Sequence, residues 1–434
     1  MFDAVRFIEE KRDGRAHGPE ELQVFVESFH KGDIPDYQAS SWLMAAFLRG
    51  LDKAELVAFT LALAKSGKVV EFPDGLDCVD KHSTGGVGDK TSLVLVPLVA
   101  ACGVPVAKLS GRGLGFTGGT VDKLESIPGF NAHLSMEGFV DQVRRIGCAI
   151  SGHSGDLAPA EKRFYELRDV TGTIPSIPLI ASSILSKKLA GGSRSFVFDV
   201  KTGSGAFMKD LDGARALARQ LVDLSKALGR KSLAVISGME QPLGRWVGNA
   251  AEVREAIEVL RGSGPTDTTS LCVSLGGAMV FLAGRAACRG EGEKACREAL
   301  VSGKALEHFR LLLEAQGGST ACLESPEKEL PLSTETTLVR SGMKGRLASF
   351  GTDRIGTALR YVGGGRQRKE DAIDPGVAVE ILAKIGDEVS PGSPVLALYH
   401  RGGEAGETAA RILAESFTVA QEAAVPPLIH ETVE

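Results

Sequence analysis

Two glycine-rich runs, 80–90 and 110–125, flank one apolar segment in the first third of the chain. The second run reads S-G-R-G-L-G-F-T-G-G-T-V-D-K-L-E, and its five glycines are too many for an ordinary core element. A glycine has no Cβ, so its backbone N–H can approach an anion closely and the chain can adopt a positive φ without strain. The two runs therefore predict loops that bind a ligand.

The first run, D-K-H-S-T-G-G-V-G-D-K, leads into an apolar segment that predicts a helix over 91–102. The free N–H groups and positive dipole end at a helix N-terminus suit phosphate. Neither run has the Walker pattern G-x-x-x-x-G-K-[ST], and neither has G-x-G-x-x-G in a strand-to-helix setting. Two glycine-rich surface turns are the alternative, but two such runs around one helix and one strand favour a binding site.

The length of 434 residues predicts two or three domains, and the net charge of −5 argues against binding to nucleic acid. Seven cysteines form no C-x-x-C pair, which is typical of a reducing compartment. The N-terminus has no apolar signal core, and the longest apolar run, 93–107, is shorter than a membrane span. We therefore expect a cytoplasmic protein with no membrane contact.

Residues 1–65 show helical periodicity only, and short apolar strands alternate with helices from about residue 66. We expect strands at 104–109, 148–151, 196–200 and 233–236, and helices near 91–102, 135–146, 212–228 and 249–260. Such alternation predicts a parallel sheet. A helical stretch over 159–189 is too long for one crossover, and valines with turn signals after about 335 predict a β-rich tail with a final helix near 405–416.

The two runs resemble the signature of the pyrimidine nucleoside phosphorylase and thymidine phosphorylase family. The resemblance continues through shorter motifs in the same order, at 127–130, 163–169, 183–188 and 199–208, and it spans essentially the whole chain. A signature of this length with four further motifs is far more specific than one short pattern.

The resemblance implies an α/β fold in which a small all-helical domain joins a large, mostly parallel α/β domain with a β-rich C-terminal part. The expected boundaries are 1–65 with 160–192 for the helical domain, 66–159 with 193–335 for the α/β domain, and 336–434 for the barrel-sandwich-like C-terminal domain. A cleft between the lobes would close by hinges near 66–68, 155–160 and 190–193. Members of the family form homodimers through the helical domain, so we expect the same here.

The implied reaction is reversible phosphorolysis of uridine, thymidine or deoxyuridine to the free base and a (deoxy)ribose 1-phosphate. Inorganic phosphate is the co-substrate, and the chemistry requires no other cofactor. A strict thymidine phosphorylase is the nearest alternative, and the sequence does not separate the two preferences. A phosphoribosyltransferase of the anthranilate type and a non-catalytic nucleoside sensor are two further alternatives.

The resemblance places phosphate on six residues, and the residue types alone favour nearly the same set: Lys81, Ser83, Ser92, Lys108, Ser110 and Thr120. Viewed singly, Ser92 also fits a helix N-terminal hydroxyl and Lys108 a lysine at a strand edge.

The pyrimidine base is expected to bind Arg168, Ser183 and Lys187, with Arg168 and Lys187 as catalytic residues that stabilise the leaving base. Ser183 and Lys187 are four residues apart, so they share one face of a predicted helix, although a solvated stripe has the same spacing. His82 is the third candidate catalytic residue, either as a general acid to a ring carbonyl or as a group that only packs against the base.

Two positions depart from the family pattern. Phe116 stands where a histidine is usual, so ring packing replaces a polar contact. Some bacterial members hold a potassium ion near positions that match Gly88, Leu243 and Glu255, yet this chain has Lys90 beside them, and its ammonium group is an alternative to the ion.

A glycine-rich segment near the end of the chain, 363–365, precedes Arg366, Arg368 and Lys369. A solvated basic loop is the favoured interpretation of this segment, and an approach to the phosphate is the alternative.

Overall fold

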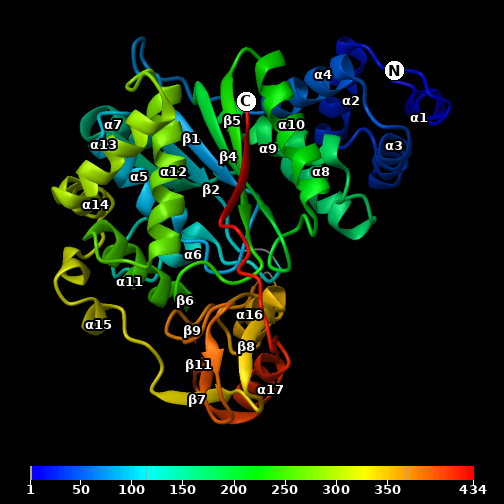
Figure 1. Cartoon of the computed structure of the whole chain (residues 1–434). Helices are drawn as coiled ribbons and strands as arrows, with labels where there is room; N and C mark the ends of the chain where they lie inside the picture. Colours follow the sequence, from blue (N-terminus) through cyan, green and yellow to red (C-terminus); the bar gives the residue numbers. More distant parts are fainter. Residues whose placement is uncertain (1, 114, 369) are drawn as a thin grey trace.

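The computed structural model describes residues 2–113, 115–368 and 370–434. Figure 1 shows helices around the N-terminus, a central sheet with helices about it, and a β-rich part reached late in the chain. This arrangement confirms the expected fold class. In the described part of the chain, no helix is both long and apolar enough to cross a membrane.

Six helices form the helical part: α1 (Ala4–Arg12), α2 (Pro19–Lys31), α3 (Asp36–Arg49), α4 (Lys53–Ala64), α8 (Pro159–Val170) and α9 (Ile177–Ala190). Helix α8 packs against α2 and α3, and α9 packs against α4. Phe164 of α8 enters the aromatic core, where its ring centroid lies 4.5 Å from that of Phe29. The insertion and the N-terminal helices therefore share one hydrophobic core.

Six strands form the central sheet: β1 (Val79–Ser83), β2 (Val106–Ser110), β3 (Cys148–Gly152), β4 (Ser195–Thr202), β5 (Lys231–Gly238) and β13 (Ile429–Val433). They lie in the order β13-β5-β4-β1-β2-β3. The pairings among β1 to β5 are parallel, and only β13 runs antiparallel to its neighbour in this sheet of described residues. The four strands expected from the sequence all lie in this sheet.

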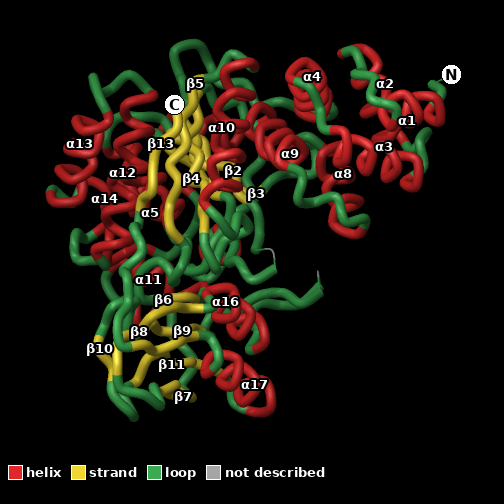
Figure 2. Tube along the Cα trace, turned by 45° about the vertical axis from the view of Figure 1, so that its right-hand side comes forward, coloured by secondary structure: helices red, strands yellow, loops and turns green. Residues whose placement is uncertain are grey.

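Helices cover both faces of the sheet (Figure 2). Successive side chains of a strand point to opposite faces. Val197 of β4 accordingly packs in the core built with α5 (Thr91–Ala101) and α12 (Thr266–Leu282), while Phe196 and Phe198 pack in the core built with α9 and α10 (Leu211–Ala227). The remaining elements of this part are α6 (Thr120–Leu124), α7 (Met136–Ile146), α11 (Asn249–Leu260), α13 (Arg289–Val301), α14 (Lys304–Ala315), η1 (Thr320–Leu323) and α15 (Pro326–Glu329).

The β-rich part contains two small sheets, β10-β8-β12 and β6-β9-β11-β7. Its elements are β6 (Trp246–Val247), β7 (Glu335–Arg340), β8 (Gly345–Phe350), α16 (Thr352–Tyr361), β9 (Ala378–Ile381), β10 (Glu388–Val389), β11 (Pro394–His400), α17 (Gly403–Ala414) and β12 (Phe417–Ala420). Strand β6 comes from the central part and pairs with β9. The chain then returns, and β13 pairs with β5, a crossing between the two parts that the sequence did not predict.

Candidate active site

The two glycine-rich runs meet at one edge of the sheet. Strands β1 and β2 are parallel neighbours, so the loops that follow them lie side by side at the carboxyl ends of the strands, where open α/β sheets bind ligands. The first glycine loop comprises residues 84–90, and the second glycine loop comprises residues 111–113 and 115–119. They touch, because a Cβ added at Gly85 would lie 3.4 Å from Thr117 Cγ2.

The start of the first run is a strand rather than a loop, which corrects the interpretation of the sequence. Asp80, Lys81, His82 and Ser83 form most of β1 and pair in register with β4. No apolar residue marks these four positions, so the usual signal for a buried strand is missing. Ion pairs with Lys188 and Asp199 offset the cost of burying the charges of Asp80 and Lys81.

Two predicted phosphate-binding lysines are buried close together. Lys81 Nζ donates to Thr91 Oγ1 at 2.6 Å and lies 3.1 Å from Asp199 Oδ2. Lys108 Nζ donates to the carbonyl oxygen of Lys81 at 2.7 Å. Burial and the neighbouring cation Lys188 lower the pKa of Lys108 to about 7. The site thus holds one amine that is only partly protonated near neutral pH.

The predicted phosphate-binding hydroxyls lie at strand and helix ends. Ser83 and Ser110 are the last residues of β1 and β2, and Ser92 and Thr120 lie in the first turns of α5 and α6. At the N-terminus of α5, the backbone N–H of Thr91 donates to Asp89 Oδ1 at 3.2 Å and that of Leu93 donates to the carbonyl oxygen of Lys90 at 3.0 Å, while the positive end of the helix dipole favours an anion beside it. Among these four hydroxyls, that of Ser83 donates to a described side chain, Asp89 Oδ2, at 2.5 Å.

Acidic side chains hold the lysines in place, and the sequence did not single them out. Asp199 lies 2.9 Å from Lys201 Nζ and accepts a hydrogen bond from Ser237. Asp89 is buried, which opposes its charge, yet Lys201, Lys81 and other cations outweigh burial and hold the pKa of Asp89 well below its usual range. These carboxylates balance the positive charge of the buried lysines.

Helix α9 brings Ser183 and Lys187 together as predicted from their spacing. Lys187 Nζ lies 3.0 Å from Ser183 Oγ. Glu161 of α8 engages both: its Oε2 lies 2.8 Å from Lys187 Nζ, and its Oε1 accepts a hydrogen bond from Ser183 Oγ. Glu161 is buried and was not predicted, because a glutamate in the first turn of a helix is a common N-terminal charge.

The end of α9 is fastened to the sheet beside the glycine loops. Lys188 Nζ lies 2.5 Å from Asp80 Oδ2 and donates to the carbonyl oxygen of Leu109 at 3.1 Å. Lys188 is buried, so it serves the structure while its neighbour Lys187 keeps 25% of its side chain exposed. A direct ion pair therefore joins the helix that carries Ser183 and Lys187 to the strand that leads into the first glycine loop.

Arg168, a predicted base-binding residue, is buried and makes structural hydrogen bonds that the sequence did not indicate. Its guanidinium donates to the carbonyl oxygens of Thr173, Ile174 and Leu179 at 2.7–3.2 Å. Burial lowers the pKa of Arg168 to about 10. The arginine thus fixes the turn between α8 and α9 through three of its five N–H groups.

His82 does not have the near-neutral pKa that a general acid needs. Burial and the cations Lys188, Lys108 and Lys187 hold the pKa of His82 well below its usual value, so the ring is neutral at pH 7. His153, which follows β3, was missed by the sequence analysis. Burial and the same three lysines lower the pKa of His153, and its Nδ1 is buried without a hydrogen-bond partner among the described residues.

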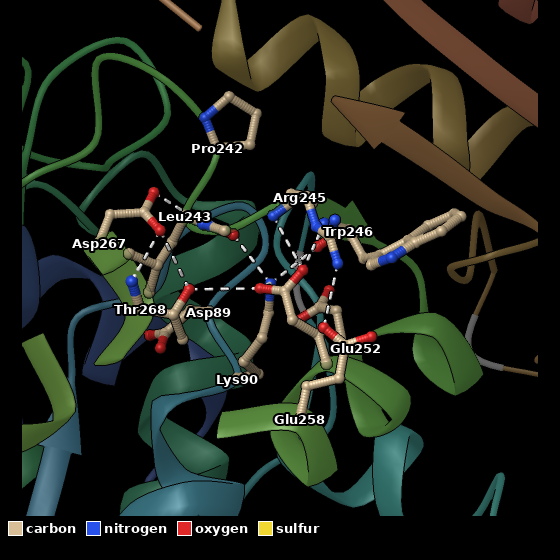
Figure 3. A network of polar contacts seen from close by, with 12 residues as sticks. Asp89, Lys90, Pro242, Leu243, Arg245, Trp246, Glu252, Glu258, Asp267 and Thr268 are labelled. Atoms are coloured by element: carbon tan, nitrogen blue, oxygen red, sulfur yellow. Dashed lines mark hydrogen bonds and ion pairs between the residues drawn. The ribbon is translucent and has the colours of Figure 1, made fainter. Parts of the chain in front are cut away.

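The oxygens predicted to hold potassium instead bind an ammonium group (Figure 3). Lys90 Nζ donates to the carbonyl oxygens of Leu243 and Trp246 at 2.8 and 2.9 Å, and it lies 2.8 Å from Glu255 Oε1. Gly88 packs against the same loop, because a Cβ there would lie 2.6 Å from Leu243 O. Within the described chain, no group of three or more His, Cys, Asp or Glu side chains forms a metal site.

Phe116 packs between aromatic and cationic neighbours, in line with the ring-packing role expected of it. Its centroid lies 5.5 Å from that of Phe207, and Lys209 Nζ lies 5.4 Å above its ring. Of the predicted basic loop, Arg366 forms an ion pair with Asp122 at 2.9 Å, whereas Lys369 lies outside the described residues.

A helical bundle and a parallel α/β lobe with phosphate-type loops together define a glycosyl transferase, and the chain belongs to that family. The model of its α/β domain matches residues 75–306, and the model of its helical bundle domain matches residues 5–67. A third model, the pyrimidine nucleoside phosphorylase C-terminal domain, matches residues 347–420.

Curated relatives show that the chain belongs to the pyrimidine-nucleoside phosphorylase family, which confirms the resemblance found in the sequence. Pyrimidine-nucleoside phosphorylase from Staphylococcus haemolyticus is 48% identical over 431 residues, and that from Geobacillus stearothermophilus is 46% identical, each over 99% of both chains. Among solved structures, anthranilate phosphoribosyltransferase from Thermus thermophilus has a TM-score of 0.58 at 19% identity, covering 71% of this chain and 98% of its own. At that identity the last similarity concerns the fold alone.

Proposed function

We propose that this chain is a pyrimidine nucleoside phosphorylase that acts on uridine, thymidine and deoxyuridine, and thus a pentosyltransferase. Relatives of that name align with it from end to end. The observation that carries the proposal is the ion pair between Lys188 and Asp80. It holds the helix that bears Ser183 and Lys187 against the strand that leads into the first glycine loop, so both substrates can meet between them.

Phosphate would bind where β1 and β2 end, against the N-termini of α5 and α6. Lys81 and Lys108 supply charge, and Ser83, Ser92 and Ser110 supply hydroxyls, with Thr120 at the start of α6. A phosphate oxygen then attacks C1′ of the sugar while the bond from C1′ to the pyrimidine nitrogen breaks, and the bonding electrons pass to the base. Holding the two reactants in line accounts for much of such an acceleration.

The leaving base gains negative charge, which Lys187 and the remaining N–H groups of Arg168 would stabilise. In the absence of a nucleoside, Glu161 satisfies Lys187 and Ser183. A pyrimidine that presents a carbonyl oxygen and a ring N–H offers both residues a replacement partner. Glu161 would then keep the two side chains oriented without contacting the sugar.

Phosphate would also change the protonation of its neighbours. Burial, and after it the surrounding lysines, lower the pKa of both Lys108 and His82 in this structure. A bound anion reverses that effect and favours the charged forms of both. We infer that His82 becomes a competent acid only after phosphate has bound, which would impose an order on the reaction.

No organic cofactor has a role in this scheme, and phosphate is the co-substrate. For the candidate cation site we propose that the Lys90 ammonium takes the place of potassium. Its three oxygen partners are the carbonyl and carboxylate types that an alkali cation prefers, and Lys90 and Glu255 are both fully buried.

We further propose a cytoplasmic homodimer that forms through the helical part. Three apolar side chains of α3, Tyr37, Met44 and Leu48, are spaced by seven and four residues, so they share one face. They are 72%, 38% and 73% exposed, and Val5 of the adjacent α1 is 55% exposed. Leu48→Asp should shift the protein from dimer to monomer in light scattering, whereas an unchanged mass would place the interface elsewhere.

The test of the function is release of uracil from uridine and of thymine from thymidine, followed by absorbance with and without inorganic phosphate. Release that requires phosphate and yields one pentose 1-phosphate per base supports the proposal. Release without phosphate would indicate a hydrolase, and release that requires pyrophosphate and a 5-phosphoribosyl donor would indicate a phosphoribosyltransferase. Comparable rates with both nucleosides separate the broad enzyme from a strict thymidine phosphorylase.

A further inference from the structure

The β-rich C-terminal part rests on the loops that surround the proposed phosphate site. Thr352, at the start of α16, donates through Oγ1 to the carbonyl oxygen of Glu240 at 2.9 Å, and its backbone N–H donates to Ser204 Oγ. Gly356 of the same helix meets the second glycine loop so closely that a Cβ there would overlap the carbonyl oxygen of Phe116. The C-terminal part therefore lies directly behind these loops.

One charged contact connects this part to the backbone of the second glycine loop. Arg366 Nη1 lies 2.9 Å from Asp122 Oδ1. The other carboxylate oxygen of Asp122, Oδ2, accepts a hydrogen bond from the backbone N–H of Gly113 at 2.7 Å. Asp122 is thus a bridge between an arginine of the C-terminal part and a backbone group of the loop.

The bridge depends on Arg366 because Arg112, the second cation at Asp122, also pairs with Glu125. Arg112 Nη1 also reaches Asp122 Oδ1, at 2.9 Å, but Arg112 makes two hydrogen bonds to Glu125 as well and its side chain is 40% exposed. The Asp122 side chain is only 2% exposed. A buried carboxylate that loses a cation becomes costly, so the loop that it holds would relax.

The second glycine loop is too tightly folded to adjust to a displacement of Asp122. A Cβ at Gly113 would lie 2.7 Å from the carbonyl oxygen of Thr117, so the chain folds back on itself within a few residues. Thr120, one of the expected phosphate ligands, begins α6 directly after this fold, and Asp122 lies in the same turn of helix. A shift of Asp122 would therefore move both the loop amides and Thr120.

From these contacts we infer that Arg366 is a positioning residue for phosphate: through Asp122, the C-terminal part sets the conformation of the second glycine loop. The inference rests on the proposed function for its substrate, inorganic phosphate. Arg366 does not contact the reacting atoms. It also gives the C-terminal part, which the sequence left without a role, a defined contribution to activity.

The experiment compares Arg366→Ala with Arg366→Lys and with a matched control, Arg401→Ala. Arg401 forms an ion pair with Asp374 at 2.8 Å in the same part of the chain. Within the described residues, its side chain donates no hydrogen bond to either glycine loop. For Arg366→Ala we expect the KM for phosphate to rise about tenfold while kcat at saturating phosphate changes by less than about threefold. Arg366→Lys should recover much of the loss, and Arg401→Ala should resemble the unchanged enzyme.

A second readout does not depend on turnover. Inorganic phosphate should raise the thermal midpoint of the unchanged protein and of Arg401→Ala. It should raise that of Arg366→Ala less at each concentration, because the stabilisation by a ligand grows with the logarithm of its concentration divided by its Kd. An Arg366→Ala protein with an unchanged KM for phosphate and an unchanged phosphate shift would overturn the inference. So would equal losses for Arg366→Ala and Arg401→Ala.

The two readouts also separate this inference from the function itself. If the unchanged protein released no base in the presence of phosphate, the proposed function would fail, and the phosphate shift would still test the role of Arg366. Should Arg366→Ala fold poorly, Arg366→Gln retains most of the side-chain volume and serves in its place. In that variant, too, a phosphate shift equal to that of Arg401→Ala contradicts the inference.

Discussion

Replacing Lys90 by alanine should destabilise the protein and create a requirement for a monovalent cation. The substitution removes an ammonium group that lies within 2.9 Å of three oxygens, all in the protein interior. Breaking a buried ion pair from one side typically costs about 3 to 5 kcal/mol. Glu255 keeps hydrogen bonds from the backbone N–H groups of Arg245 and Trp246, both at 2.8 Å, so we expect the lower end, about 3 kcal/mol.

Thermal unfolding measured in potassium and in sodium provides the assay. The midpoint of Lys90→Ala should fall by roughly 3 °C relative to the unchanged protein, because the unfolding entropy of 434 residues is about 0.9 kcal/mol/K. Potassium should then restore part of the loss, about 1.4 kcal/mol at ten times its dissociation constant. The unchanged protein should melt equally in both salts, because its cation position is already filled.

Lys384→Ala is the matched control for this prediction. Lys384 lies 3.1 Å from Asp267 in the same network, but both side chains are 27% exposed. Partly exposed pairs contribute about 1 kcal/mol or less, and no potassium effect is expected. The reasoning would be refuted if Lys90→Ala lost no more stability than Lys384→Ala, or if the unchanged protein melted higher in potassium than in sodium.

Two further predictions concern the substrates. The pKa of Lys108 is about 7 without a ligand, and a bound anion raises it, so anion affinity should be greatest below pH 7 and fall as pH rises, by at most about tenfold per pH unit. Sulfate, which does not titrate in this range, is the suitable probe, and its affinity should be measured from about pH 6 to about pH 9. An affinity that does not change with pH in the unchanged protein would exclude Lys108 as the titrating group. So would a pH dependence that Lys108→Gln leaves unaltered. Glu161→Gln should lower kcat/KM for uridine about tenfold, or about 1.4 kcal/mol, without altering the KM for phosphate, since the carboxylate orients Lys187 and Ser183. A tenfold change in the KM for phosphate as well would show that Glu161 also affects the phosphate loops.

Most of the fold follows from apolar patterns that sequence alone displays. The strands over 196–200 and 233–236 are apolar runs between helices, and the structure extends each of them to eight residues. Strand β1 was not predicted because two of its three buried residues are the charged Asp80 and Lys81, and ion pairs with distant residues make their burial possible. Strand β13 was not predicted because no local sequence pattern indicates that the last residues pair with a distant strand, β5.

In the site, too, local features could be predicted from the sequence and long-range partners could not. Glycine loops, helix starts and the four-residue spacing of Ser183 and Lys187 are local features, and each was predictable. What sequence could not provide is which groups partner them: Glu161 with Lys187, or three backbone carbonyls with Arg168. Those pairings depend on the packing of α8 against α9, which local periodicity does not specify.

The central claim is that the loops after β1 and β2 bind phosphate while α9, which Lys188 ties to β1, serves the base. Its most direct test measures turnover and the phosphate-induced thermal shift together in Lys187→Ala. We predict a loss of turnover of two or more decades, because a charge-assisted contact made mainly in the transition state contributes about 3 kcal/mol, with an undiminished phosphate shift. Turnover within about tenfold of the unchanged enzyme, or a lost phosphate shift, would contradict this division.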